Sequence, residues 1–152
     1  MRKLILLLAL TVVAAAPAAA ADAKTEVMTT VHRMMDAFNK GDSITAMAAC
    51  AEQVSILDDV PPHEWHGVGA FAQWLQDYDA DARQRGITDG FVTLLAPRHV
   101  DVTGDRAYVV APANYTYKQR GKPVKEAGST FTVALQRSAA GWRISGWAWS
   151  KH

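Results

Sequence analysis

Apolar residues recur with two different periods along this chain, and the change of period divides it into two parts. Between Lys24 and Lys40, apolar positions are spaced four, three and four residues apart. This is the spacing of one face of an α-helix. The apolar residues on that face are Val27, Val31, Met34, Met35 and Phe38.

Two further helices are predicted before residue 90. Asp42 can cap a short helix that runs through Ala51. A third helix runs from about Val68 to Arg85, where aromatic and apolar residues follow the i, i+3, i+4, i+7 rule. Between these helices, residues 54–58 are typical of a short strand, which the prolines at 61–62 stop.

After Gly90 the chain consists of β-branched and aromatic runs divided by short turns, as an antiparallel meander requires. The predicted strands are Phe91 to Thr103, Arg106 to Gln119, Lys125 to Arg137 and Trp142 to Ser150. The order predicts an α+β fold, a cone-shaped roll in which a curved, mixed but mostly antiparallel sheet wraps around three N-terminal helices. Such a roll tends to leave a conical pocket.

The first 21 residues differ from the rest of the chain. A basic start, Met1 to Lys3, precedes the apolar run Leu4 to Val13 and an alanine-rich tract with several Ala-x-Ala sites. This is the pattern of a secretory signal peptide, and the apolar run is short for a membrane anchor. We predict a signal peptide at 1–21, cleaved near Ala21, and one domain at 22–152 that is periplasmic or secreted and free of the membrane.

Charge and cysteine content narrow the function classes. The formal net charge of +1 becomes −1 when Arg2 and Lys3 leave with the leader. No basic excess remains to neutralise phosphates, which argues against a nucleic-acid partner. Cys50, the single cysteine, lies among alanines and is predicted to be a buried thiol without an internal disulfide partner. No cofactor is expected.

Four short segments carry a resemblance to a known superfamily. They are Phe38-Asn39-Lys40-Gly41-Asp42, Ile56-Leu57-Asp58, Trp65-His66-Gly67 and Gly141-Trp142-Arg143-Ile144. In these segments the chain resembles the nuclear-transport-factor-2-like superfamily, also called SnoaL-like or ketosteroid-isomerase-like. The resemblance implies the conical α+β fold. It leaves function open, because the superfamily includes isomerases, dehydratases, hydrolases and non-catalytic binding modules.

Asp58 is the main catalytic candidate. It occupies the position at which the chain resembles ketosteroid isomerases and their proton-shuttling Asp. A carboxylate pointing into a dry cone can act as a general base, whereas an Asp before Val60-Pro61 can equally cap an ordinary turn. His32 is expected either to face Asp58 across the cone as its catalytic partner or to lie on the helix surface.

The isomerase mechanism also needs donors that hold the developing oxyanion. By the resemblance, these positions fall at Met34 and near Thr132 here, and neither supplies an acidic donor. A metal site is not expected at His63 and His66, because no third ligand is evident and the two rings would point to opposite faces of a strand.

Aromatic residues and one methionine are the candidate ligand-binding residues: Met35, Trp65, Tyr115, Tyr117, Trp147 and Trp149. The two tyrosines share a strand face, as do the two C-terminal tryptophans, although a bulge at Gly146 can re-aim the latter. These pairs form either a pocket wall or a patch buried in a homodimer. Trp74 and Tyr78 are predicted to be helix-to-sheet core.

The sequence therefore favours an exported protein that binds a small apolar or aromatic molecule in a conical pocket and forms a homodimer through its sheet. Two alternatives remain open. One is a lyase, isomerase or hydrolase that uses Asp58 as general base with His32. The other is a non-catalytic dimerising envelope protein.

Overall fold

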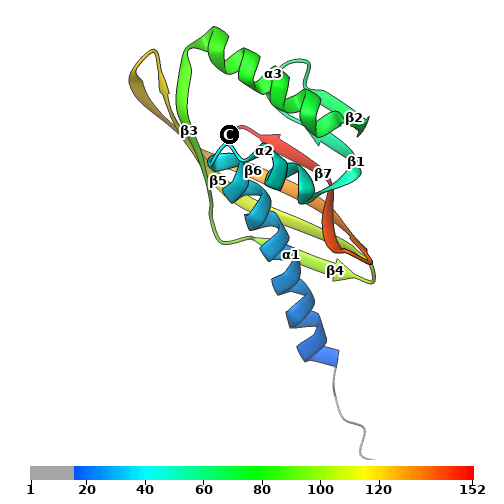
Figure 1. Ribbon diagram of the computed structural model, residues 1–152. Helices are drawn as coiled ribbons and strands as arrows, with labels where there is room; N and C mark the ends of the chain where they lie inside the picture. The colour runs from blue at the N-terminus through cyan, green and yellow to red at the C-terminus, as the bar shows by residue number, and fades with distance from the viewer. Residues whose placement is uncertain (1–15) are drawn as a thin grey trace, which may run out of the picture.

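The computed structural model describes residues 16–152, which form three helices and a seven-stranded sheet (Figure 1). The helices are α1 (Ala16–Asn39), α2 (Ser43–Ala48) and α3 (Ala70–Arg85). The strands are β1 (Cys50–Leu57), β2 (Glu64–Val68), β3 (Ile87–Leu94), β4 (His99–Thr103), β5 (Arg106–Gln119), β6 (Lys122–Ser138) and β7 (Gly141–Ser150). Most of the predicted leader, residues 1–21, lies outside the described residues, so its cleavage stays a prediction.

The strands are arranged in the order β2-β1-β7-β6-β5-β3, and β4 pairs with β5 next to β3. All pairs are antiparallel except β1 with β7, which run parallel, with Ile56 beside Trp147. The helices lie against one side of this curved sheet (Figure 1). The predicted α+β fold with a mixed, mostly antiparallel sheet is confirmed.

The core lies between α1 and the concave face of the sheet. The predicted apolar face of α1 is buried, and Val27 and Val31 have no exposed surface. Alternate residues of β6 meet them: Phe131, Val133 and Leu135 are at most 2% exposed. Each such side chain contributes about 1.5–3 kcal/mol when it leaves water. The N-terminal part of α1 extends past the sheet (Figure 1), and its residues 20–26 are mostly exposed.

Cys50 opens β1, four residues earlier than the predicted strand. The second helix ends at Ala48, not at Ala51, because the carbonyl of Ala49 accepts a hydrogen bond from the Ile144 N–H at 3.0 Å. This bond begins the pairing with β7. The predicted burial of Cys50 is confirmed, and burial raises the pKa of its thiol to about 12, which leaves it unreactive at neutral pH.

Two other boundaries differ from the prediction. The third helix begins at Ala70, because Val68 pairs with Gln53 as the end of β2. The predicted strand from Phe91 to Thr103 is two strands, β3 and β4, and the chain between them keeps contact with β5 through Leu95, whose N–H donates to the Pro112 carbonyl at 2.9 Å. The predicted strand Arg106 to Gln119 is confirmed as β5.

The bulge expected at Gly146 is present one residue earlier. Gly146 pairs with Ala134 and Ile144 with Leu135, so that Ser145 is the extra residue. A Cβ at Gly146 would lie 3.0 Å from the Ser55 carbonyl oxygen, so a larger residue would push β1 away. Beyond the bulge, Trp147 points into the core with 6% of its surface exposed.

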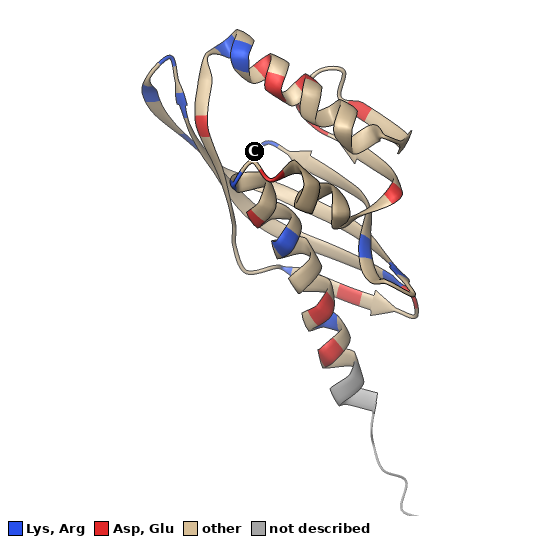
Figure 2. Ribbon diagram, in the orientation of Figure 1, with Lys and Arg blue, Asp and Glu red and all other residues tan. Residues whose placement is uncertain are grey.

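Basic side chains gather at the β5–β6 hairpin and in the last turn of α3, where acidic side chains precede them (Figure 2). Within residues 16–152, no helix is both long enough and apolar enough to cross a membrane.

Candidate ligand-binding site

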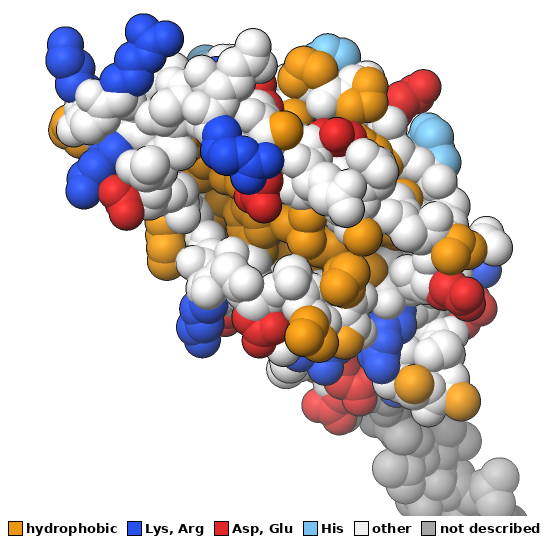
Figure 3. Space-filling view, turned by 45° about the horizontal axis from the view of Figure 1, so that its top comes forward, with side chains coloured by type: hydrophobic (Ala, Val, Ile, Leu, Met, Phe, Trp, Pro, Cys, Tyr) orange, Lys and Arg blue, Asp and Glu red, His pale blue; other side chains and the backbone are white. Residues whose placement is uncertain are grey.

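A pocket opens between α1, α3 and the concave face of the sheet, with a void of about 720 Å³ that includes its mouth. Its walls are mostly hydrophobic, and seven of the lining residues are aromatic: Phe38, Trp74, Tyr78, Tyr115, Phe131, Trp147 and Trp149. In the space-filling view, hydrophobic side chains floor a hollow whose edge carries charged side chains of both signs (Figure 3). The lining is typical of sites that bind small apolar molecules.

The C-terminal end of α1 and the middle of α3 form two sides of the pocket. Asn39, the last residue of α1, is fastened to β3: its side chain donates to the Val92 carbonyl and accepts from the Val92 N–H, both at 2.8 Å. Phe38 then meets Trp74 and Tyr78 of α3 with ring centroids 5.5 and 5.3 Å apart. These aromatic contacts join the two helices at the pocket wall.

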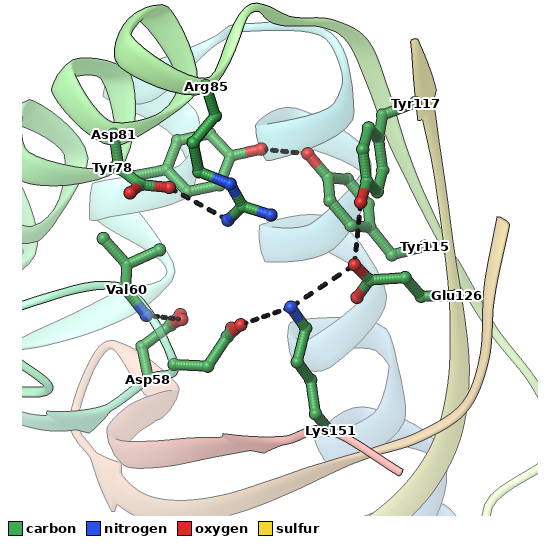
Figure 4. A network of polar contacts seen from close by, with 10 residues as sticks. Asp58, Val60, Tyr78, Asp81, Arg85, Tyr115, Tyr117, Glu126 and Lys151 are labelled. Atoms are coloured by element: carbon green, nitrogen blue, oxygen red, sulfur yellow. Dashed lines mark hydrogen bonds and ion pairs between the residues drawn. The ribbon is translucent and has the colours of Figure 1, made fainter. Parts of the chain in front are cut away.

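Asp58 follows β1 and points into this pocket (Figure 4). Its Oδ1 accepts a hydrogen bond from the Val60 N–H at 3.1 Å, and its Oδ2 accepts one from the Trp74 indole N–H at 3.0 Å. The two interpretations of Asp58, turn cap and pocket carboxylate, therefore describe the same side chain. Burial, with a smaller contribution from Asp59, raises the pKa of Asp58 to about 7 despite these two donors.

Two tyrosine hydroxyls meet on the opposite wall. The Oη atoms of Tyr78 and Tyr115 lie 2.7 Å apart, at hydrogen-bond distance (Figure 4). Burial raises the pKa of both hydroxyls, and the contact between them raises that of Tyr78 further. Both therefore stay protonated at neutral pH. One hydroxyl proton lies between the two oxygens, and the other is free to donate to a bound molecule.

Charged side chains surround the mouth. The Lys151 ammonium lies 2.8 Å from Asp59 Oδ2 and 3.3 Å from Glu126 Oε1. Across the mouth, Arg85 Nη1 lies 3.1 Å from Asp81 Oδ2, one helical turn away on α3 (Figure 4). Burial opposes ionisation of Asp59, but the hydrogen bonds with Lys151 and Asp58 and the charge of Lys151 together hold the pKa of Asp59 below its ordinary value.

Of the predicted ligand-binding residues, Met35, Tyr115, Trp147 and Trp149 line the pocket, and Trp65 and Tyr117 do not. Tyr117 is 6% exposed and donates its hydroxyl hydrogen bond to Glu126 Oε1 at 2.9 Å. Tyr117 thus orients the Glu126 carboxylate at the mouth of the pocket. Trp65 is buried on β2, where its indole N–H donates to Asp77 Oδ2 on α3 at 2.9 Å. It thus braces α3 against the sheet.

His32 does not meet Asp58. It is exposed on α1 and lines a separate surface groove between α1 and α2, together with Asp36 and Lys40. Its position follows Val31, which is fully buried, and the step of 100° per residue carries it off the buried face. The structure therefore does not form the expected Asp58–His32 pair.

The two positions that the isomerase resemblance implies for oxyanion donors, Met34 and Thr132, do not lie together. Met34 lines the pocket with an apolar side chain. Thr132 lies between the buried residues Phe131 and Val133 on β6, and alternation along a strand places it on the opposite face of the sheet. His66 pairs with Glu64 in an exposed contact of 3.4 Å. Among residues 16–152, no group of three or more His, Cys, Asp or Glu side chains is placed to hold a metal ion.

Several functional residues were not identified from the sequence. The Asp81–Arg85 pair has the i, i+4 spacing of a helical ion pair, and it follows Trp74 and Tyr78 on the same face, so the pattern contained this signal. Glu126 and Lys151 carry no comparable signal, since only the fold brings their strands to the pocket.

Solved structures of other proteins share this architecture. A protein from Novosphingobium aromaticivorans, described as nuclear-transport-factor-2-like with a cystatin-like fold, aligns with a TM-score of 0.72 at 18% identity, covering 90% of this chain and 86% of that one. A nuclear transport factor 2 superfamily protein from Salmonella enterica aligns with a TM-score of 0.71 at 17% identity, covering 86% and 92%.

A ketosteroid isomerase-like protein from Erwinia carotovora atroseptica gives a TM-score of 0.65 at 18% identity, covering 84% of this chain and 94% of that one. At these identities the similarity establishes the fold alone. No curated protein matches the sequence. The family model described as SnoaL-like domain matches residues 27–151, nearly the whole length of the folded part. The chain therefore belongs to the SnoaL-like domain family.

Proposed function

We propose that this protein binds a small, largely apolar or aromatic molecule in the pocket between α1, α3 and the sheet. One observation carries the proposal: seven aromatic side chains line one open pocket, and the polar groups of that pocket are gathered at Asp58, the tyrosine pair and the mouth. A flat apolar molecule that enters an aromatic-lined pocket is stabilised because its apolar surface leaves water.

The five tryptophans provide an internal control for this proposal. Trp74, Trp147 and Trp149 line the pocket, whereas Trp65 and Trp142 do not. In a ¹H–¹⁵N spectrum, addition of the neutral probe 2-naphthylmethanol should shift the three pocket indole signals and leave the other two in place. Unchanged spectra, or shifts confined to Trp65 and Trp142, would contradict the proposal.

A second function, proton transfer to or from the bound molecule, is favoured by the environment of Asp58. With a pKa of about 7, this carboxyl is divided between both protonation states near neutral pH, as a general base or acid requires. The ionised carboxylate would take a proton from carbon next to a carbonyl. The electron pair would move to the carbonyl oxygen, which would accept a hydrogen bond from the tyrosine pair.

This second function has a direct test that does not depend on knowing the natural substrate. The bicyclic ketone 2-tetralone is incubated with the protein in D₂O, and loss of its α-proton NMR signals is followed. Exchange above the buffer rate that disappears in Asp58→Asn would support proton transfer. Exchange equal in the wild type and in Asp58→Asn would leave binding as the sole function.

We also propose, from the sequence alone, that the protein is exported and forms a homodimer. Expression of the full chain in a bacterium, followed by N-terminal sequencing of the periplasmic fraction, tests cleavage near Ala21. Light scattering coupled to size exclusion tests the dimer, and a monomer at high concentration would remove it.

A further inference from the structure

We propose that the molecule bound in this pocket carries a positive charge, as an amine or quaternary ammonium group attached to a flat apolar body. This inference rests on the proposed binding function and specifies the chemical class of the ligand. It is drawn from two independent features of the pocket, the balance of its charges and the nature of its walls.

The charge balance is negative. Four carboxyl groups line the pocket, two after β1, one on α3 and one on β6: Asp58, Asp59, Asp81 and Glu126. Only two cationic side chains face them, Arg85 on α3 and Lys151 after β7. The lining residues of α1 and β3 are uncharged. Even with Asp58 protonated, the remaining carboxylates outnumber the cations by one, and ionisation of Asp58 adds a second unit of negative charge.

The cations of the mouth are already engaged. Lys151 bridges two carboxylates, Asp59 at 2.8 Å and Glu126 at 3.3 Å, and Arg85 is held by Asp81 at 3.1 Å. A carboxylate on the ligand would have to displace these partners and would also approach Asp58 in a site with little water. An ammonium group need not displace Arg85 or Lys151, because a carboxylate can accept several hydrogen bonds, and the side chains of Asp81 and Glu126, 19% and 21% exposed, still face the pocket mouth.

The walls suit the same group. Trp74, Tyr78 and Tyr115 line the pocket. Trp147 also lines it and stands edge-on to Trp74, with ring centroids 4.8 Å apart. The negative face of an aromatic ring attracts a cation, most strongly where water is excluded, and several such rings around one space form the type of site that recognises quaternary ammonium groups. Negative charge and aromatic faces therefore favour the same ligand class.

The test uses three probes of one shape and different charge: 2-naphthylmethylamine, 2-naphthylmethanol and 2-naphthoate. Calorimetry at pH 7 and low salt should give a dissociation constant about tenfold lower for the amine than for the alcohol, and the weakest binding for the acid. The advantage of the amine should fall as salt is added, because its electrostatic part is screened.

Two isosteric variants locate the effect. Glu126→Gln and Asp81→Asn each remove one negative charge at the mouth and should reduce the ratio of amine to alcohol affinity. Asp101→Asn is the matched control, since Asp101 is an exposed carboxylate on β4 that does not line the pocket.

The outcomes separate the two proposals. Alcohol binding without an amine advantage, tighter binding of the acid, or a ratio unchanged in both rim variants would overturn the charge inference while the binding function stands. Failure of all three probes to bind would overturn both.

Discussion

The indole nitrogen of Trp74 lies 3.0 Å from the Oδ2 atom of Asp58, and its N–H donates a hydrogen bond to the carboxyl group. Trp74 is itself part of the pocket wall and is only 5% exposed. One residue of α3 thus provides both an aromatic surface for the ligand and a donor that favours the ionised form of the pocket carboxylate. The position of α3 therefore influences the charge of Asp58.

Trp74→Phe is expected to raise the pKa of Asp58 above its present value of about 7 by roughly one unit. The substitution keeps a ring in the wall but removes a donor that stabilises the ionised carboxylate. NMR titration of ¹³C-labelled aspartate carboxyl groups measures the shift. Trp65→Phe is the matched control, because it removes an indole donor to Asp77 elsewhere on α3. An unchanged Asp58 titration in Trp74→Phe would contradict the assigned hydrogen bond.

Stability is expected to fall as pH rises, and Asp58 is the cause. Its pKa is about 7 in the folded chain against an ordinary value of 3.8, so the folded state holds an extra proton between these values. The free energy of unfolding should decrease by roughly 2–4 kcal/mol between pH 4 and pH 8 because of this group. Urea denaturation compares wild type with Asp58→Asn. The test is how the difference in unfolding free energy between wild type and Asp58→Asn changes with pH, not how stable the variant is at any one pH.

Much of the fold follows directly from local pattern. The apolar spacing of α1, the cap formed when Asp42 accepts from the Thr45 N–H at 3.0 Å, and the bounds of β5 all depend on neighbouring residues. The error at Cys50 has a different origin. A short alanine-rich stretch favours helix by propensity, but pairing with β7 at Ile144 ends the helix early, and that partner is far away in the sequence.

Only part of the site could be predicted, again because some of its residues are brought together by elements far apart in the sequence. Asp58 could be found because the end of a strand next to a turn is a local feature. Glu126 and Lys151 could not, because alternation along β6 assigns each residue a face but not a position along the curved sheet. The sequence left two positions open for His32, because helical periodicity defines a stripe of residues, while the neighbouring elements decide how wide the buried part of that stripe is.

His32→Ala is expected to leave ligand binding and proton exchange unchanged. The imidazole is exposed in a groove on the outer side of α1, and the substitution of such a residue changes the free energy of unfolding by about 0.5 kcal/mol or less. Probe titration and thermal unfolding check this expectation. A large loss of α-proton exchange in His32→Ala would restore the Asp58–His32 pair as the catalytic unit.

Gly90→Ala is expected to disrupt the tyrosine pair without touching either tyrosine. A Cβ at Gly90 would lie 2.7 Å from Tyr115 Oη and 3.2 Å from Cε2, so the ring must move and the 2.7 Å contact with Tyr78 must lengthen. Crowding of this kind typically costs about 1–3 kcal/mol of stability. Because the hydroxyl makes the shortest contact, the same change should cost less in a Tyr115→Phe background. A double-mutant cycle of unfolding free energies measures this coupling, and strictly additive effects would show that Gly90 does not set the position of the Tyr115 hydroxyl.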